Sequence, residues 1–325
     1  MNYLIIFLVL SALSFIYLKL ADKFNIIDKP NHRSSHTVPT IRGGGILFYF
    51  GILIYFLLFG FKYPYFVIGV TLISIISFID DIISLKILVR LPFQFLAIAL
   101  SLYQVEIILD SGISFESFLV AFPLLFVGVA FINGYNFMDG INGITGFYSI
   151  VSLISLFAIN HYENLIDSEL LASVFISILV FGFYNFRKKA RMFAGDIGSI
   201  SMAVLIFFVA ALLIYKTKAP VILLLVAVYS VDTILTMIHR KRIGEKLTEP
   251  HRKHIYQEMV HTLKMSHLSV SAIYGVLQLV INTVAFFTYK LGFVYQVIIL
   301  LSVTASVIGL YLVGFNKIKK MKSSQ

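Results

Sequence analysis

Long apolar runs recur along the whole chain, and they constrain its fold more than any other feature. About eleven runs are long enough to cross roughly 30 Å of hydrocarbon, which takes about 20 helical residues. Apolar residues make up 59% of the chain and charged residues only 13%, which no ordinary soluble domain shows. This pattern predicts an all-α polytopic membrane protein. The runs fall at 2–20, 43–61, 64–79, 87–105, 116–133, 144–160, 169–184, 199–215, 219–238, 267–289 and 292–314.

The composition between the runs excludes several other classes of protein. No linker or charge block divides the sequence, so we expect a single integral-membrane domain over residues 1–325. The chain has no cysteine, which excludes disulfides and thiol chemistry. Its net charge of +10 is spread over short loops and forms no basic stripe or known binding motif. We therefore expect the lipid bilayer, and no nucleic acid, as a partner.

Basic residues are distributed unevenly between the two sides of the expected membrane. If each apolar run is one crossing, 22 of the 26 Lys and Arg residues fall on the same side. By the positive-inside rule this side is cytoplasmic, which places the N-terminus outside and the C-terminus inside. The opposite side keeps four lysines and carries six acids, namely Glu106, Asp110, Glu116, Glu163, Asp167 and Glu169. The cytoplasmic loops that we expect to carry the chemistry are 21–42, 80–90, 133–143, 185–199 and 239–266.

Two adjacent carboxylates, Asp80 and Asp81, follow the third apolar run. Adjacent carboxylates at a helix end can bind a divalent cation or act as a base, whereas the alternative is a solvated loop start.

A further acid, Asp232, lies within the run 219–238. Ionisable groups inside a membrane are costly, so we expect Asp232 to line the site or to pair with a neighbouring Lys or Arg.

The next cytoplasmic loop carries a polar side chain at every third residue, and glycines separate them. Its polar members are Asn133, Asn136, Asp139 and Asn142. Because glycine permits close backbone approach, such a segment could coordinate a metal or bind uracil or phosphate. An ordinary turn is the alternative, but a turn alone would not need three Asn and one Asp. We favour a binding role.

Four cations, including Lys188, precede the segment from Gly195 to Ser199, which opens the next helix. A helix N-terminus presents free N–H groups and a positive dipole end, which suits a phosphate or an ionised Asp196. Membrane topology alone explains at least two of the cations, but it does not explain Asp196.

The longest polar loop contains His251, Arg252 and His254. Imidazole and guanidinium donors at this spacing can clamp a diphosphate. A zinc site is the rival interpretation, and it would need a distant carboxylate because cysteine is absent. His261 and His267 are expected to be bystanders.

In their order and on the same side of the membrane, these segments resemble the polyprenyl-phosphate N-acetylhexosamine-1-phosphate transferases. This superfamily includes undecaprenyl-phosphate GlcNAc-1-phosphate transferase and the phospho-MurNAc-pentapeptide translocase. The earlier stretch that contains Arg42 looks like the first cytoplasmic loop of the branch that initiates O-antigen and lipopolysaccharide synthesis. The segments that carry the resemblance are Asp28 to Gly45, Asp80-Asp81, Asn133 to Gly143, Phe193 to Ser199 and His251-Arg252-x-His254.

The resemblance implies a reaction and a location. A membrane polyprenyl (undecaprenyl) phosphate would attack the β-phosphate of a UDP-N-acetylhexosamine, releasing UMP and leaving a lipid diphosphate sugar. The enzyme would lie in the bacterial cytoplasmic (inner) membrane with its site on the cytoplasmic face, and a homodimer is compatible with this assignment. Mg²⁺, with Mn²⁺ as a substitute, is the expected ion.

The resemblance also implies roles for individual residues. Asp196 would ligate the metal with Asn136 or Asp139 nearby. The catalytic residues would be Asp80, Asp81 and Asp139, and either Asp80 or Asp81 would orient or deprotonate the lipid phosphate. Asn142 stands where the family carries the second acid of an Asp-Gly-x-Asp-Gly pattern. An amide can ligate Mg²⁺ or bond the nucleotide, but it cannot act as a base. The expected substrate-binding residues are Asn133, Asn136, Asn142, Arg42, Lys188, His251, Arg252 and His254.

Two rival functions deserve a test. A polytopic transporter of a phosphorylated or anionic substrate would carry its ionisable residues near the middle of the bilayer, whereas these acids gather at one surface. A non-catalytic membrane scaffold would have no need to hold Asp80, Asp139 and Asp196 together.

Overall fold

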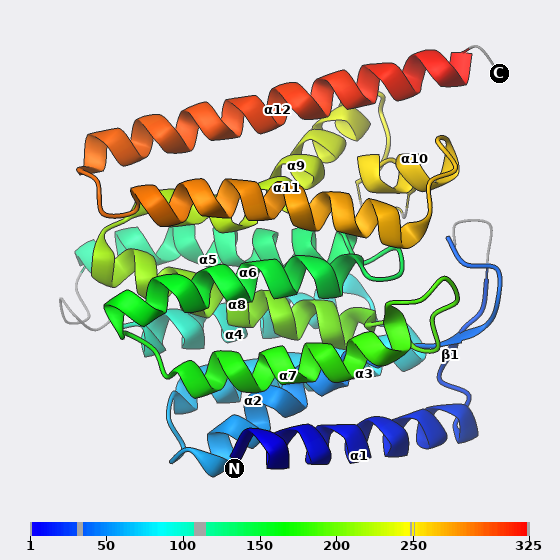
Figure 1. Cartoon of the computed structure of the whole chain (residues 1–325), viewed down its shortest axis with the longest axis horizontal. Helices are drawn as coiled ribbons and strands as arrows, with labels where there is room; N and C mark the ends of the chain where they lie inside the picture. Colours follow the sequence, from blue (N-terminus) through cyan, green and yellow to red (C-terminus); the bar gives the residue numbers. More distant parts are fainter. Residues whose placement is uncertain (1, 31–34, 107–114, 248, 250, 324–325) are drawn as a thin grey trace.

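The chain forms a bundle of helices with almost no strand, in a computed structural model that describes residues 2–30, 35–106, 115–247, 249 and 251–323. Asp110 and residues 31–34, which the sequence analysis named, lie outside these ranges. The N- and C-termini lie at opposite ends of the bundle (Figure 1). The helices are α1 (Asn2–Lys23), α2 (Ile46–Leu58), α3 (Pro64–Ile83), α4 (Ile87–Gln104), α5 (Phe115–Phe137), α6 (Ile144–Glu163), α7 (Ser168–Asn185), α8 (Gly195–Thr217), the 3₁₀ segment η1 (Pro220–Val226), α9 (Ala227–Arg242), α10 (Ile255–His261), α11 (His267–Thr288) and α12 (Phe293–Ser323).

The expected membrane architecture is confirmed. Among the described residues, ten helical segments are long and apolar enough to cross a membrane, with η1 and α9 together forming one of them. The expected span at 43–61 is shorter than predicted, because only the 13 residues of α2 are helical there. Each of the eleven apolar runs therefore corresponds to one apolar helical segment, and the seven-residue α10 lies between spans.

Several helices extend into segments that the sequence analysis treated as loops. Asp80 and Asp81 lie within the last turn of α3, and Asn133 and Asn136 lie on α5. The run expected from residue 199 begins earlier, because α8 starts at Gly195. These polar residues stay helical because their side chains find partners within the fold, as described below.

α8 lies at the centre of the bundle. It packs against α2, α3, α4, α5 and α6, and most of its residues are buried. A helix that is apolar on all sides is stable only when it is surrounded by other helices or lipid. α1 and α12 lie at opposite edges of the bundle and leave most of their apolar side chains exposed, as expected for helices that face lipid (Figure 1).

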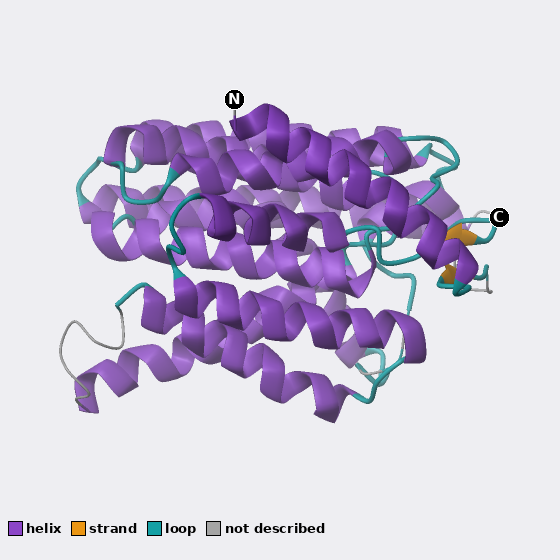
Figure 2. Ribbon diagram, turned by 90° about the horizontal axis from the view of Figure 1, so that it is seen from below, coloured by secondary structure: helices purple, strands orange, loops and turns teal. Residues whose placement is uncertain are grey.

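A small hairpin joins the first polar loop to the start of α8. Strands β1 (Ile27–Asp28) and β2 (Thr40–Ile41) pair antiparallel, at the end of the bundle where the C-terminus lies (Figure 2). Beyond β2, the backbone N–H groups of Gly44 and Gly45 donate to Phe193 O and Ala194 O, at 2.8 and 2.9 Å. A Cβ atom on Gly45 would overlap the backbone of Gly198, so only glycine permits this close approach. The contact fixes Arg42 beside the first turn of α8.

Candidate active site

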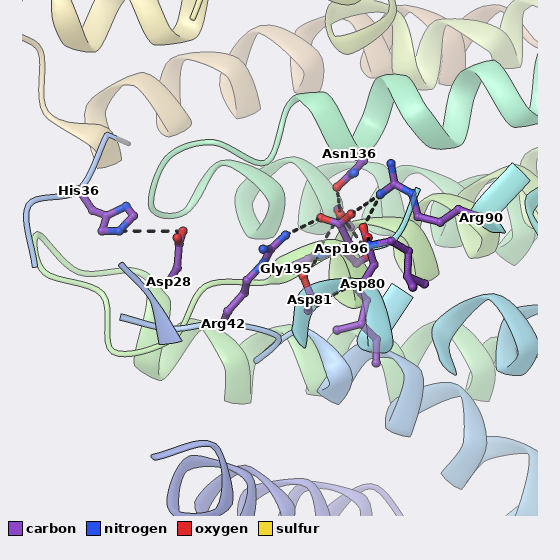
Figure 3. A network of polar contacts seen from close by, with 12 residues as sticks. Asp28, His36, Arg42, Asp80, Asp81, Arg90, Asn136, Gly195 and Asp196 are labelled. Carbon is purple, nitrogen blue, oxygen red and sulfur yellow. Dashed lines mark hydrogen bonds and ion pairs between the residues drawn. The ribbon is translucent and has the colours of Figure 1, made fainter. Parts of the chain in front are cut away.

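Three aspartates from two helices meet two arginines at this end of the bundle. Asp80 and Asp81 come from α3 and Asp196 from the first turn of α8, and Figure 3 shows these aspartates between Arg42 on one side and Arg90 on the other. Like charges this close would repel each other strongly, so the two guanidinium groups are needed to neutralise the cluster. The sequence analysis predicted that the aspartates converge, and the structure brings them together.

Asp81 caps the N-terminus of α8. Its carboxylate accepts hydrogen bonds from the backbone N–H groups of Asp196 (2.9 Å) and Ile197 (3.1 Å), and Arg42 Nε lies 2.7 Å from Asp81 Oδ1. Gly195 has φ of +73°, a conformation that turns the chain into the helix at this point. The free N–H groups that the sequence suggested for a phosphate are therefore occupied by the protein's own carboxylate.

Asp80 makes a separate set of contacts. Its Oδ1 accepts from Leu85 N at 2.5 Å, and its Oδ2 pairs with Arg90 Nη1. The same Arg90 atom lies 2.9 Å from Asp196 Oδ2, while Arg42 Nη2 lies 3.1 Å from Asp196 Oδ1. Both carboxylate oxygens of Asp196 are thus paired with an arginine. Sequence analysis counted Arg90 only as a topological charge and did not identify this role.

A cavity of about 460 Å³ opens beside this cluster and gathers residues from five separate polar segments. Six of the residues predicted from sequence line it, namely Arg42, Asn136, Asp139, Asn142, Asp196 and His251. The other predicted site residues do not line the cavity. They are Asp80, Asp81, Asn133, Lys188, Arg252 and His254. Their functional roles stay predictions.

Asp139 and Asn136 line the cavity together with Arg42. Asp139 Oδ1 accepts from the hydroxyl of Thr145, and Asn136 Oδ1 accepts from Ser199 Oγ at 2.6 Å. Burial raises the pKa of the Asp139 carboxyl to about 6, because desolvation disfavours the charged form more than the Thr145 hydrogen bond favours it. A carboxylate in this state gains from a cation that neutralises it.

Asn142 is held by its amide nitrogen. Nδ2 donates to the backbone oxygens of Arg187 (2.9 Å) and Lys188 (3.2 Å), whereas Oδ1 is buried without a partner in the described structure. Beside it, Asn185 Oδ1 accepts from Gly143 N at 2.7 Å. A buried carbonyl oxygen without a donor costs free energy, so the Asn142 oxygen is available to a ligand N–H or O–H group.

Four predicted residues occupy other environments. Asn133 and Gln94 pair through their amides at 2.8 and 3.2 Å, which joins α5 to α4. The side chain of Lys188 is exposed. His254 is buried and pairs with Asp232, so Asp232 neither lines the cavity nor pairs with Lys or Arg as expected. Arg252 does not line the cavity.

The cavity also has members that sequence analysis missed. His267, expected to be a bystander, lines the wall, and its Nδ1 accepts from Asn142 N at 3.3 Å. Asp28 and His36 approach each other at 3.9 Å across the first polar loop.

His251, which sequence analysis predicted, is neutral in the cavity at pH 7. Burial, with contributions from His254 and Arg240, lowers the pKa of its imidazole to about 4. The remaining lining side chains include Ser35, Asn185, Phe193 and Gln257.

The donor set at the cavity suits a hard divalent cation. Its candidate ligands are carboxylate and amide oxygens of Asp139, Asp196 and Asn136, the kind of ligand that Mg²⁺ prefers. Within the described residues, no three or more His, Cys, Asp or Glu side chains are arranged as a ready-made metal site. Mg²⁺ usually binds through one or two carboxylates together with waters and substrate phosphates, so the residues present fit this ion.

Comparison with known proteins agrees with this geometry. Residues 63–214 match Glycosyl transferase family 4. The chain is 26% identical to a probable undecaprenyl-phosphate N-acetylglucosaminyl 1-phosphate transferase of Bacillus subtilis, over 90% of this chain and 87% of that protein. It is 27% identical to the undecaprenyl-phosphate alpha-N-acetylglucosaminyl 1-phosphate transferase of Escherichia coli K12, over 77% and 73%. The decaprenyl-phosphate N-acetylglucosaminephosphotransferase of Mycolicibacterium smegmatis is 24% identical, over 78% and 73%.

The fold and the cavity together define a multi-pass membrane enzyme whose polar site lies at one end of a helical bundle. Within that class, the match of residues 63–214 to Glycosyl transferase family 4 and the similarity to undecaprenyl-phosphate N-acetylglucosaminyl 1-phosphate transferases support the polyprenyl-phosphate hexosamine-1-phosphate transferase family. The resemblance predicted from the motifs is confirmed.

Proposed function

We propose that this protein transfers N-acetylhexosamine 1-phosphate from a UDP-sugar to a membrane polyprenyl phosphate, at the cytoplasmic face of a bacterial inner membrane. The observation that carries the proposal is the meeting of Asp196, Asp139, Asn136 and Arg42 around one cavity at the end of the bundle. Phosphate groups need cations and donors around them, and a divalent cation held by Asp196 with Asn136 or Asp139 would meet that need together with Arg42. A transporter has no reason to gather these groups at one surface.

The transfer exchanges one P–O bond for another. An oxygen of the lipid phosphate bonds to the β-phosphorus, and the bond from that phosphorus to the bridging oxygen breaks, so UMP leaves with the electron pair. A phosphate monoester has its second pKa near 6, so the nucleophile is already mostly ionised at neutral pH and needs no strong base. This fits the structure, because Asp80 and Asp81 are committed to arginines and backbone N–H groups.

Charge stabilisation is the main task of the chain's own residues. Bound Mg²⁺ would neutralise charge on the diphosphate, held by Asp196 with Asn136 or Asp139. Arg42 lies at the cavity wall beside Asp196, and its guanidinium group could pair with phosphate oxygens there. The neutral imidazole of His251 and the unpaired oxygen of Asn142 suit the uncharged sugar and uracil. A homodimer stays a prediction of the resemblance.

Purified protein with undecaprenyl phosphate and a panel of UDP-N-acetylhexosamines tests the proposal directly. We expect UMP release and a radiolabelled lipid product with at least one donor, UDP-GlcNAc being the first to try, and a loss of both when EDTA removes the metal. Asp196→Asn should abolish turnover while the protein stays folded. Turnover of that variant within tenfold of wild type would contradict the metal assignment, and label that crosses the membrane without entering lipid would favour a transporter.

A further inference from the structure

Asp232 is a carboxylate buried within the bundle, away from the acidic cluster. It lies on α9 and is only 2% exposed. Its Oδ2 accepts from Tyr274 OH at 2.6 Å, and its Oδ1 accepts from Thr236 Oγ1 at 3.1 Å and Ile255 N at 3.3 Å. Burying an ionised carboxylate is very unfavourable unless donors surround it. This degree of satisfaction indicates that Asp232 orders the groups that donate to it.

His254 is a further partner of Asp232 and the one that connects it to the site. Its Nδ1 lies 3.1 Å from Asp232 Oδ1, and its side chain is almost completely buried. Because a carboxylate only accepts, the Nδ1 atom carries the hydrogen in this pair. The other ring nitrogen, Nε2, is buried without a partner in the described structure. Asp232 therefore fixes the orientation of the imidazole.

The same contacts hold the beginning of α10. His254 precedes the first residue of α10, and Asp232 binds both the His254 ring and the backbone N–H of Ile255. Two neighbours of this point line the cavity, namely Gln257 in the first turn of α10 and His251, whose ring centroid lies 4.9 Å from that of His254.

A second contact joins α10 to the segment from Asn133 to Gly143. Tyr256 OH donates to Phe137 O at 3.0 Å, and the Tyr256 ring packs so closely on Gly140 that a Cβ atom there would overlap the hydroxyl. With Asp232 on one side and Phe137 on the other, the position of α10 relative to Asn136 and Asp139 is determined at two points.

We infer that Asp232 is a positioning residue that acts through His254 to hold His251 and Gln257 against the sugar-nucleotide side of the cavity. The inference rests on the proposed function and extends it to a residue that does not touch the cavity. For histidines that bind metals, removing the carboxylate that orients the ring costs about 10- to 100-fold in affinity or activity. We expect loss of the Asp232 carboxylate to raise the KM for the UDP-sugar about tenfold or more, without affecting the other substrate.

Two substitutions at His254 separate orientation from simple packing. Asn carries an amide nitrogen close to the position of Nδ1 in His, so His254→Asn keeps a donor for Asp232, whereas His254→Leu removes it. Asp232→Asn and His254→Leu should each raise the KM for the UDP-sugar about tenfold or more, while the KM for polyprenyl phosphate and the Mg²⁺ titration stay unchanged. His254→Asn should stay close to wild type. The double variant Asp232→Asn/His254→Leu should be no worse than either single variant, because both remove the same contact.

Tyr311→Phe is the matched control. Tyr311 OH bonds Thr236 Oγ1 at 2.9 Å in the same buried network, but it makes no contact with His254. It should cost stability without changing the KM for the donor. Amide hydrogen exchange in residues 251–261 should increase in Asp232→Asn and remain as in wild type in Tyr311→Phe.

Three results would overturn the inference: additive losses in the double variant, a wild-type KM for the donor in Asp232→Asn, or unchanged exchange of residues 251–261 in that variant. The exchange measurement does not depend on turnover. If wild-type protein releases no UMP from any donor, the proposed function fails, and the exchange experiment still decides whether Asp232 orders α10.

Discussion

Arg90 Nη1 is shared between Asp80 and Asp196, at 2.9 Å from Asp196 Oδ2 and in direct contact with Asp80 Oδ2. One side chain on α4 therefore connects the ends of α3 and α8. It also occupies a carboxylate oxygen that we assign to the metal, so the arginine and the cation compete for Asp196.

Arg90→Gln should separate these two effects. Without the guanidinium, Asp80 and Asp196 repel each other, so ligand-free protein should bind Mn²⁺ several-fold more tightly, as measured by electron paramagnetic resonance. Turnover should fall roughly tenfold to a hundredfold, since charge-assisted hydrogen bonds contribute about 1.5–3 kcal/mol and order the cluster. Lys86→Gln, at the exposed residue that precedes α4, is the control and should change neither quantity. Weaker Mn²⁺ binding in Arg90→Gln would contradict the competition.

Asp139 should make the stability of the metal-free protein depend on pH. Its pKa is about 6 in the fold against an ordinary value of 3.8, so the folded state keeps a proton that the unfolded chain has already lost. The stabilisation from this proton is complete below about pH 4 and disappears as the pH rises through about 6. In EDTA, Asp139→Asn should therefore gain in Tm relative to wild type between about pH 5 and pH 7. Glu106→Gln, at an exposed acid elsewhere, should show no such relative gain.

Asn142→Asp, which restores the acid of the family pattern, should destabilise this protein. Asn142 Nδ2 donates to the backbone oxygens of Arg187 and Lys188, and a carboxylate would place an anion against both. The lost donors alone should cost about 1–3 kcal/mol. Asn142→Ala loses the same donors without adding charge, so it should unfold at a higher temperature than Asn142→Asp at neutral pH. The opposite order would show that the backbone oxygens do not determine the residue type here.

The sidedness can be measured independently of catalysis. A reporter that is active only in the cytoplasm should work when fused after Gln325 and fail when fused between Asn160 and Glu169, because 22 of the 26 basic residues favour the former side. Figure 1 shows the last turn of α12 and the connection between α6 and α7 at opposite ends of the bundle. The reverse pattern of activity would place the cavity outside the cell.

The spans were predicted from one-dimensional patterns, whereas the meeting of Asp139, Asn136 and Asp196 was implied by the family resemblance. Apolar length identifies helices, and charge asymmetry brings alternate loops to one side. The division of labour between Asp80 and Asp81 could not be predicted. Successive helical residues point about 100° apart, and only the packing of α3 on α8 decides which carboxylate meets Arg90 and which meets the backbone of α8.

Contacts between distant segments could not be predicted from the sequence either. Asp232 was expected to line the site or to pair with Lys or Arg, but its partners are His254 and Tyr274. These residues lie in other segments of the chain, and the hydrophobic pattern of the span that holds Asp232 does not indicate which segments pack against it. Asn133 fits the three-residue repeat of polar residues in the segment from Asn133 to Gly143. Because Asn133 lies on α5, however, its side chain bonds Gln94 instead of entering the site. A repeat that begins on a helix and ends in a loop does not keep its side chains on one face.

The 13 residues of α2 have a consequence for the surrounding lipid. A helix of this length rises about 20 Å, well short of the roughly 30 Å of hydrocarbon that it faces. We therefore expect either thinner leaflets around α2, or a position of the glycine loop that carries Arg42 below the level of the headgroups. In either case, we predict that a phosphate on a long isoprenoid tail reaches Arg42 while its tail remains in the bilayer. Catalysis on such a substrate becomes a reaction within the plane of the membrane, and its rate should depend on acyl-chain length.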